Sequence, residues 1–405
     1  MAVRANKPAF NIREKLKELT HSIGLKGREL MSAATVQEAR DLVSAGRKNL
    51  IMNGACTINQ RFGSGSYTLT GSSDYFPVDR FRSWAVGGGQ FTIQRSDNAP
   101  PGFKNSMMYT VSTTDTSVGN SEYYCIQQRI EGYNIAHLGL GTADAKPVTL
   151  SFWVKSDLPG IYSGAFFNTG QSYTCVFEYE INRADTWEYK SLTIPAATIG
   201  SFTTDSSNYG LGIWWDLGSG TGFNNTPFVW KNAGDFRSAN QVPFIKTSGA
   251  KFRMTGVQLE VGKNATEFEH RSYGEELALC QRYYQQSSPL PVGQFHTNID
   301  GIYNTAFNYS GTTWAAVSCQ LPVSMRLTPA VTLYTNISAG NPSAGGSDQP
   351  GFVGHYQLAT NWGASEAGVG GQTTDRNIVI ASSAPGRGTT GPCLILWNFT
   401  ADAEL

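Results

Sequence analysis

Between residues 49 and 261 the chain alternates apolar and polar positions with a period of two. The alternation is cleanest in Val148–Ser156, where apolar Phe152 is followed by Trp153 on the opposite side of the pattern. Successive side chains of a strand point to opposite faces, so the pattern predicts half-buried strands. Turns rich in Gly, Asn, Asp or Pro separate them, as is typical of a β-sandwich. The predicted strands are Phe91–Arg95, Ser106–Val111, Tyr123–Ile130, Val148–Ser156, Tyr173–Ile181, Glu188–Ile194, Tyr209–Asp216 and Lys251–Val261.

Residues 1–48 instead carry apolar positions at helical spacing. Two short helices are predicted, the second beginning at a capping box formed by Thr35 and Glu38. Such short helices cannot bury a core alone, so their apolar stripes need copies of themselves or another protein. Packing on the chain's own β domain is the alternative. The residues expected to make an attachment contact are Ile12, Leu16, Leu19, Ile23, Val36, Leu42 and Val43.

A helical period returns at Ser272, which forms a capping box with Glu275. The apolar face of this predicted helix is Leu277, Leu279, Cys280, Tyr283 and Tyr284. After a linker at Pro289–Pro291 the pattern turns strand-like again, and the Gly-, Ser- and Asn-rich segment Asn336–Gly371 is interpreted as an extended surface loop. The predicted strands of this last region are Gly301–Asn308, Trp314–Gln320, Ala330–Tyr334, Asn377–Ile380 and Cys393–Ala401.

These patterns predict a mostly β chain of four parts. Residues 1–48 form a helical attachment region, and residues 49–271 form a jelly-roll-like β-sandwich. Residues 272–288 form a linking helix, and residues 289–405 form a C-terminal β module, a small sandwich or knob.

Composition narrows the classes of partner. Lys and Arg total 31 and Asp and Glu total 31, so the net charge is near zero, which argues against nucleic-acid or anionic-membrane binding. No apolar stretch is long enough to span a membrane, and the first residues lack the apolar core of a signal peptide, so no membrane insertion is expected. Only 15% of residues are charged while 12% are aromatic, which suits a chain that buries surface between subunits.

Motifs for catalysis or metal binding are not found in the sequence. The six cysteines are scattered without a C-x-x-C pair, so we expect no zinc site and mostly free, buried thiols. Glu267, Glu269 and His270 form a local acid–imidazole cluster, but an ion pair with Arg271 or with a neighbouring subunit is the simpler interpretation. We therefore predict no catalytic residue, no metal and no cofactor.

Aromatic and polar residues are the candidates for ligand binding, because sugars stack on aromatic rings and amides or carboxylates bind their hydroxyl groups. Trp214 and Trp215 are adjacent in a predicted strand, so one of them must belong to the core. The long connection Gly218–Lys246 is a second candidate region, since long loops in compact domains usually bind or form interfaces. The candidate ligand-binding residues are Trp214, Trp215, Asp216, Trp230, His355, Asn361 and Trp362.

One segment carries a family resemblance. GVQLEVG (residues 256–262), followed by TEFEHR and YGEELALCQRYYQ, resembles a segment of bacteriophage virion proteins of the tail-fibre class. Three looser similarities to the same proteins accompany it. They are the NLIMNG opening at Asn49 with the Gln60–Arg61 pair and the DRF run from Asp79, the LPVSMR phrase from Leu321, and the final ADAEL. The order of the sandwich strands is also similar to that of jelly-roll modules of the carbohydrate-binding type.

The resemblance implies a non-enzymatic, homotrimeric virion protein, assembled in the host cytoplasm and most simply a tail fibre or tail-tip component. Attachment to other phage tail or baseplate proteins through the N-terminus, and contact with a host-surface glycan or protein through the C-terminal module, are what this family implies. A head-decorating or vertex fibre, or a baseplate protein without receptor binding, is the first alternative. The second is a polysaccharide-degrading tailspike enzyme, although the short repeats of a β-helix are absent from the sequence.

Overall fold

The computed structural model describes residues 48–63, 65–71, 75–287, 302–308, 317–335, 349–350, 352–357, 360–369, 373–382 and 391–405. In several strands between residues 302 and 397 the backbone alone is described. The two helices expected before residue 48, and with them the attachment residues Ile12, Leu16, Leu19, Ile23, Val36, Leu42 and Val43, lie outside the described residues, as does the linker Pro289–Pro291.

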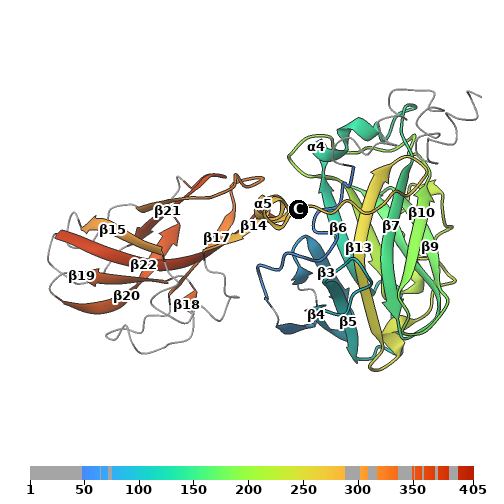
Figure 1. Ribbon diagram of the computed structural model, residues 1–405, viewed down its shortest axis with the longest axis horizontal. Coiled ribbons are helices and arrows are strands. Elements are labelled where there is room, and N and C mark those ends of the chain that lie inside the picture. The colour runs from blue at the N-terminus through green and yellow to red at the C-terminus, as the bar shows by residue number, and fades with distance from the viewer. Residues whose placement is uncertain are drawn as a thin grey trace, which may run out of the picture. The chain divides into compact units, whose positions relative to one another are not determined.

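Two antiparallel sheets form the sandwich, and each strand predicted between residues 91 and 261 coincides with an observed one (Figure 1). Sheet A contains, in spatial order, β1 (Ser66–Leu69), β4 (Gln90–Ser96), β5 (Ser106–Thr113), β13 (Lys251–Val261), β7 (Val148–Ser156) and β10 (Glu188–Ile194). Sheet B contains β12 (Trp230–Lys231), β9 (Thr174–Ile181), β8 (Gly160–Asn168), β11 (Tyr209–Asp216), β6 (Tyr123–Glu131), β3 (Phe81–Val86) and β2 (Tyr75–Val78). The chain is thus a mostly β protein, as the alternation predicted.

The core of the sandwich lies between the two sheets. Phe152 of β7 is fully buried, and its ring centroid lies 6.2 Å from that of Trp215 on β11. Phe91 of β4 and Tyr124 of β6 make a second contact across the layers, 6.0 Å between centroids. Burial of large aromatic side chains is the main favourable term that such a core supplies. The apolar positions of the period-two pattern are therefore the side chains that pack between sheets A and B.

Strand β13 occupies a central place in sheet A, between β5 and β7. Its pairing with β7 shifts register at Gly256, which adopts a positive φ of 62°. Beyond this bulge the segment from Asn49 to Gly54 runs beside β13, where the Leu50 amide donates to the Leu259 carbonyl at 2.9 Å. A Cβ on Gly54 would lie 2.1 Å from the Val257 carbonyl oxygen, so only glycine fits this approach.

The connections between strands contain short helical turns. They are α4 (Gly132–Ile135), η1 (Ala136–Leu138), η2 (Thr221–Phe223) and η3 (Phe244–Lys246). The long connection Gly218–Lys246 places Phe236 against the outer face of sheet B, where its ring stacks on Trp214 with 4.5 Å between centroids. This contact gives sheet B a second, smaller apolar cluster on its outer side.

The predicted linking helix is α5 (Tyr273–Gln281), and the Glu275 amide donates to the Ser272 hydroxyl at 3.3 Å as the capping box required. The prediction that Tyr283 and Tyr284 continue the helical face is wrong. The chain leaves the helix at Arg282 and forms β14 (Tyr284–Gln286), because these residues pair with strand β22 (Gly391–Asp402). Tertiary pairing overrides the local period here.

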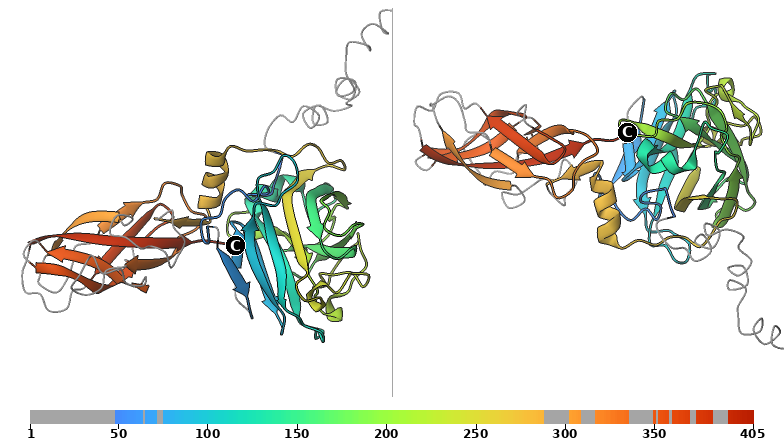
Figure 2. Two further views of the ribbon diagram at one scale, coloured as in Figure 1. Left: turned by 60° about the horizontal axis from the view of Figure 1, so that its bottom comes forward. Right: turned by 90° about the horizontal axis from the view of Figure 1, so that it is seen from above.

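The C-terminal module is a third antiparallel sheet, in which β22 is the longest strand (Figure 2). The other strands are β14, β15 (Ile302–Asn308), β16 (Val317–Gln320), β17 (Ala330–Thr335), β18 (Gln349–Pro350), β19 (Phe352–Gln357), β20 (Thr360–Val369) and β21 (Asn377–Ser382). The expectation of a loop across Asn336–Gly371 is wrong, because β18, β19 and β20 lie within it. β19 pairs with both β20 and β22, and pairing of this kind outweighs a glycine-rich composition.

Candidate functional site at the junction of the sandwich and the C-terminal module

The segments that carry the family resemblance meet at one place, where α5, β14 and the last residues of β22 contact the sandwich. We call this place the junction. Its first component is the NLIMNG opening. The Asn49 side chain accepts from the Leu259 amide at 3.0 Å and donates to the Val257 carbonyl at 3.2 Å. The Asn53 amide donates to the carboxylate of Glu276 on α5, at 2.5 Å. The opening therefore ties β13 to the linking helix.

The Gln60–Arg61 pair reaches the other side of the junction. The Gln60 side chain donates to the Tyr284 carbonyl at 2.9 Å and to Asp79, the first residue of the DRF run, at 2.5 Å. The Arg61 guanidinium lies over the ring of Tyr284, 3.8 Å from its centroid, and donates to Asp402 at 3.1 Å. It also donates to Glu404 at 3.3 Å. This buried arginine joins residues more than three hundred positions apart.

Arg80, the second residue of the DRF run, makes a parallel set of contacts. Its guanidinium lies 3.5 Å from the ring centroid of Tyr283, pairs with Glu404 and donates to the Arg129 carbonyl at 2.6 Å. Tyr283 in turn donates its hydroxyl to Glu131 at 2.9 Å. The same carboxylate accepts from Arg282 at 2.7 Å, so Arg282 and Tyr283 share one acidic partner on the sandwich.

The LPVSMR phrase and the final ADAEL complete the junction. Arg326 donates to the Ala403 carbonyl at 3.1 Å and to the Ser207 carbonyl of the sandwich at 3.2 Å. The Gln285 side chain donates to the Val323 carbonyl at 2.6 Å. The Ala403 amide donates to the Tyr283 carbonyl at 2.8 Å. Backbone and side-chain bonds therefore interlock the two parts.

In Glu131 and Arg61 burial and the neighbouring partners shift the pKa in opposite directions, and the partners together have the larger effect. Burial alone would raise the pKa of Glu131, but hydrogen bonds from Arg282 and Tyr283 lower it overall. Burial likewise disfavours the charged form of Arg61, yet the neighbouring Glu404 and Asp402 carboxylates raise its pKa. Charged hydrogen bonds in a shielded site are stronger than exposed ones, so these pairs give the junction its geometry.

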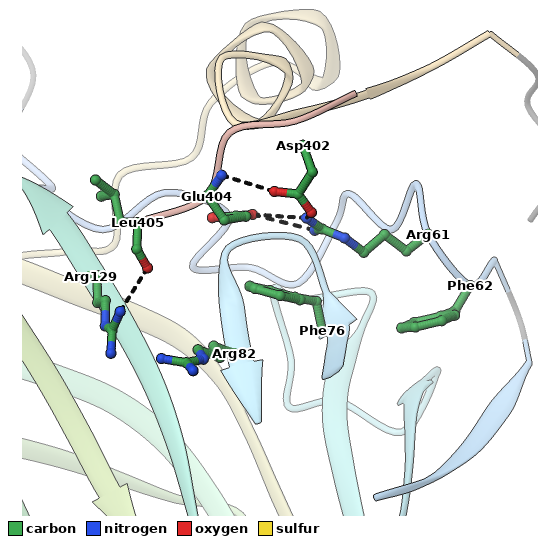
Figure 3. Close-up of a pocket in the computed structure, with 8 residues that line it drawn as sticks. All are labelled: Arg61, Phe62, Phe76, Arg82, Arg129, Asp402, Glu404 and Leu405. Atoms are coloured by element: carbon green, nitrogen blue, oxygen red, sulfur yellow. Dashed lines mark hydrogen bonds and ion pairs between the residues drawn. The ribbon is translucent and has the colours of Figure 1, made fainter. Parts of the chain in front are cut away.

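A cavity of about 280 Å³ opens beside these ion pairs (Figure 3). It is lined by Arg61, Phe62, Phe76, Arg82, Arg129, Asp402, Glu404 and Leu405. Arg82 lies over the ring of Trp84 at 4.1 Å, and Arg129 donates to the Leu405 carbonyl at 2.8 Å. The two carboxylates are held by arginines, so the arrangement is suited to holding a segment of chain in place.

The candidate ligand-binding residues of β11 are buried. Trp215 has no exposed surface and belongs to the core between the sheets, while Trp214 is 2% exposed and lies under Phe236. Asp216 accepts from the Gly218 amide at 2.7 Å and from Trp214 Nε1 at 3.2 Å, so it anchors the long connection. The two indoles face opposite ways as predicted, but both are covered, and neither presents a ring face to a ligand in this structure.

The remaining candidate ligand-binding residues lie in two places, Trp230 in the sandwich and the other three in the C-terminal module. Trp230 is half-buried at the edge strand β12, where its ring stacks on Tyr173 and its Nε1 donates to the Pro195 carbonyl at 2.7 Å. His355 lies in β19 and Asn361 and Trp362 lie in β20, where the backbone alone is described. The structure therefore brings these three onto neighbouring paired strands and does not bring them near Trp230 by any described contact.

In the acid–imidazole cluster of Glu267, Glu269 and His270, the structure shows the predicted ion pair with Arg271. Glu269 pairs with Arg271 at 3.0 Å and accepts from the Asn49 amide at 2.8 Å. The His270 ring packs against Phe268 instead, 4.9 Å between centroids. Among the described residues no group of three or more His, Cys, Asp and Glu side chains is placed to bind a metal, and no described helix could span a membrane.

The cysteines within the described chain fit the prediction of free, buried thiols. Four of the five, namely Cys56, Cys125, Cys175 and Cys280, are buried, Cys319 is more exposed, and none is in a disulfide. Burial raises the pKa of Cys56 to about 12, which leaves the thiol protonated and unreactive at neutral pH.

The comparisons with known proteins give limited information. No protein-family model and no curated protein matches the sequence. A solved structure similar in part is the enzymatically active domain of bacteriophage CBA120 tailspike protein 4, at 13% identity and a TM-score of 0.28, covering 53% of this chain and 21% of that one. TmCBM61 in complex with β-1,4-galactotriose covers 54% of this chain and 100% of its own, at 11% identity and a TM-score of 0.25.

A third similar structure is the family 11 carbohydrate-binding module from Clostridium thermocellum in complex with a β-1,3-1,4-mixed-linked tetrasaccharide. It has 10% identity and a TM-score of 0.26, and covers 50% of this chain and 99% of its own. Similarity at this level establishes neither fold nor function. The mostly β fold therefore stands on the structure itself.

Proposed function

We propose that this chain is a non-enzymatic structural protein of a tailed-phage particle. It acts as a tail fibre or tail-tip component whose C-terminal module contacts the host surface, with a glycan as the ligand. The resemblance of the GVQLEVG segment and its companions to tail-fibre-class proteins motivates the proposal. The sandwich then serves as a spacer between the particle and the C-terminal module.

The observation that carries the proposal is the junction. Each resembling segment from residue 49 onward supplies residues to it, including Asn49, Arg61, Arg80, Arg282 and Glu404. A protein that presents a binding module at a distance from its anchor needs that module to be held firmly by its spacer. Buried ion pairs with several hydrogen bonds hold such an orientation, because removing one partner leaves an uncompensated charge.

Weak binding by each copy is sufficient in this proposal. A homotrimer presents three equivalent modules to one surface, and linked sites bind together far more tightly than one site alone. The low content of charged residues, 15%, is compatible with extensive contact between copies.

Two measurements on the phage that encodes the chain test the proposal. Purified particles are probed by electron microscopy with gold-labelled polyclonal antibody raised against the folded chain, and we expect label at the tail. The purified chain is then added to host cells before infection, and we expect it to reduce adsorption. Label on the head, or unchanged adsorption, contradicts the host-contact role.

The enzyme alternative has its own readout. The chain is incubated with host-surface polysaccharide, and reducing ends are measured over time against a heat-inactivated sample. No increase is expected. A rise that depends on native protein would replace the structural role with a glycan-degrading one.

A further inference from the structure

A row of aromatic side chains crosses the outer face of sheet A, and none of them belongs to the junction or to the predicted site residues. Phe152 of β7 points into the core, so Trp153 lies on the outer face. Its neighbour across the sheet is Tyr189 of β10, with 5.5 Å between ring centroids. Tyr189 is 45% exposed, so its ring is open to a ligand. These two rings form one end of the row.

The other end of the row is built by two loops. Phe103, from the connection between β4 and β5, lies 5.0 Å from Phe268 between ring centroids, and Phe268 lies 4.9 Å from His270. A Cβ on Gly256 would lie 2.7 Å from the Phe103 ring and 3.1 Å from the Trp153 ring. The bulge at Gly256 therefore lets the two ends meet. We call the five rings of Phe103, Trp153, Tyr189, Phe268 and His270 the aromatic strip.

Positive charge lies beside the strip. Arg253 of β13 is directly paired in register with Lys155 of β7, and the alternation of buried and outward residues puts both on the same outer face as Trp153. Lys155 holds Asp185 at 2.8 Å, and Lys251 and Asp157 lie next to each other at the end of β13. Three cationic side chains thus stand against two carboxylates.

Arg253 holds unused hydrogen-bonding capacity. Its Nε and Nη1 atoms are buried and have no hydrogen-bond partner among the described residues, although the residue as a whole is half-buried. These two atoms are covered by the protein itself, so a ligand would reach the half-buried guanidinium from its exposed surface, where the Asp185 carboxylate is a charged neighbour. An acceptor with negative charge is the partner that a guanidinium binds best.

We propose that the aromatic strip and Arg253 form a binding site for an acidic oligosaccharide on the sandwich itself. The C–H faces of successive sugar rings would stack on Trp153 and Tyr189, and a sugar carboxylate would accept from Arg253. The site lies outside the C-terminal module, so it is a second contact for surface glycan, and it stands or fails independently of where the chain sits in a particle.

Calorimetric titration of the full chain with hexagalacturonate tests the site, with cellohexaose as the neutral oligosaccharide of equal length. We expect hexagalacturonate to bind at least about tenfold more tightly than cellohexaose, since a hydrogen bond to a charged group contributes on this scale. Arg253→Gln should remove that preference. Tyr189→Ser and Trp153→Ala should each weaken binding of both ligands about tenfold. Tyr133→Ala, at a 71% exposed ring on α4, is the matched control and should bind like the unaltered chain.

Trp153→Ala could disturb the sheet. Tyr189→Ser is therefore the decisive variant, because Tyr189 is substantially exposed on an edge strand. Absence of hexagalacturonate binding at millimolar concentration overturns the proposal. So does binding that Tyr189→Ser and Arg253→Gln leave unchanged. Self-association that Tyr189→Ser abolishes, without saccharide binding, would identify this face as an interface between copies and also overturn it.

Discussion

The guanidinium of Arg80 lies over the ring of Tyr283, 3.5 Å from its centroid, and the two residues bind separate carboxylates, Glu404 and Glu131. The pair links the turn before β3 of the sandwich to the chain that leaves α5. A cation over an aromatic ring in a shielded site adds to the ion pairs around it. Charged residues of the DRF run, which in the sequence resemble a surface motif, therefore lie inside the junction.

Removing the negative charge of Glu404 should destabilise the protein substantially. Glu404→Gln leaves Arg61 and Arg80, which are 8% and 3% exposed at their side chains, without one of their carboxylates. We expect a loss of about 3 kcal/mol in the free energy of unfolding, measured by urea denaturation. Asp375→Asn is the control, because the Asp375–Arg376 pair is exposed and separated by 3.9 Å, and it should change stability by less than about 1 kcal/mol. Equal effects of the two variants would contradict a structural role for the junction.

Acid should weaken the junction through Glu131. Hydrogen bonds from Arg282 and Tyr283 hold the folded-state pKa of this carboxyl below its ordinary value of 4.5, even though burial acts to raise it. The unfolded chain therefore takes up the proton first as pH falls, so the stabilisation is complete above about pH 4.5 and is lost as pH falls through the lower folded-state pKa. Unfolding free energies measured from pH 6 to pH 3 should show this decline. Glu131→Gln should be less stable at pH 6 and should show a shallower decline, and a parallel decline would refute the assignment.

The close approach of Gly54 to β13 should tolerate no side chain. Gly54→Ala places a Cβ 2.1 Å from the Val257 carbonyl oxygen, so the segment from Asn49 must move away from the strand. We expect a loss of roughly 3 kcal/mol in unfolding free energy, at the upper end for overpacking. Gly88→Ala is the matched control, since a Cβ there would meet nothing within 4 Å. If both variants melt at the same temperature as the unaltered chain, the segment is not docked as described.

The buried and the partly buried cysteines should differ in their rate of alkylation. Burial raises the pKa of Cys56 and Cys175 to about 12, whereas Cys319 is only partly buried. Treatment of the native protein with iodoacetamide at pH 8, followed by peptide mass spectrometry, should modify Cys319 and spare these two, because the thiolate is the reactive form. In urea all should react. Rapid native labelling of Cys56 would mean that the core of the sandwich opens readily.

Sequence patterns predicted the strands of sheet A more completely than those of sheet B. β8 was not predicted, although it lies inside sheet B. Seven of its nine residues, from Tyr162 to Asn168, are buried, because the long connection and Phe236 cover the outer face and remove the polar half of the pattern. Burial on both faces weakens the period-two signal, although β11, whose residues are all buried, was still predicted. The same covering explains why Trp214, chosen as an exposed ring, is buried.

The junction could be found from the sequence only as a set of motifs. Arg61, Arg80 and Arg326 stand in segments that resemble tail-fibre-class proteins, but nothing local indicates that their partners lie in the final residues. A strand with one buried face produces a period-two pattern in the sequence, whereas an ion pair between distant segments produces no pattern. The aromatic strip was missed for a related reason, since Phe103 and Phe268 come from turns and meet Trp153 only through the bulge at Gly256.

The ion pair between Arg61 and Glu404 spans 343 positions, which sets an order of events during synthesis. A ribosome delivers Glu404 only after the entire sandwich has emerged, so until then Arg80 lacks this carboxylate and Arg61 has only Asp79 as an acidic neighbour. Closing so long a loop is slow relative to forming hairpins. A nascent product interrupted before Asp402 would thus display bare positive charge where the finished one has none, and a cell or an assembling particle could distinguish the two by that difference.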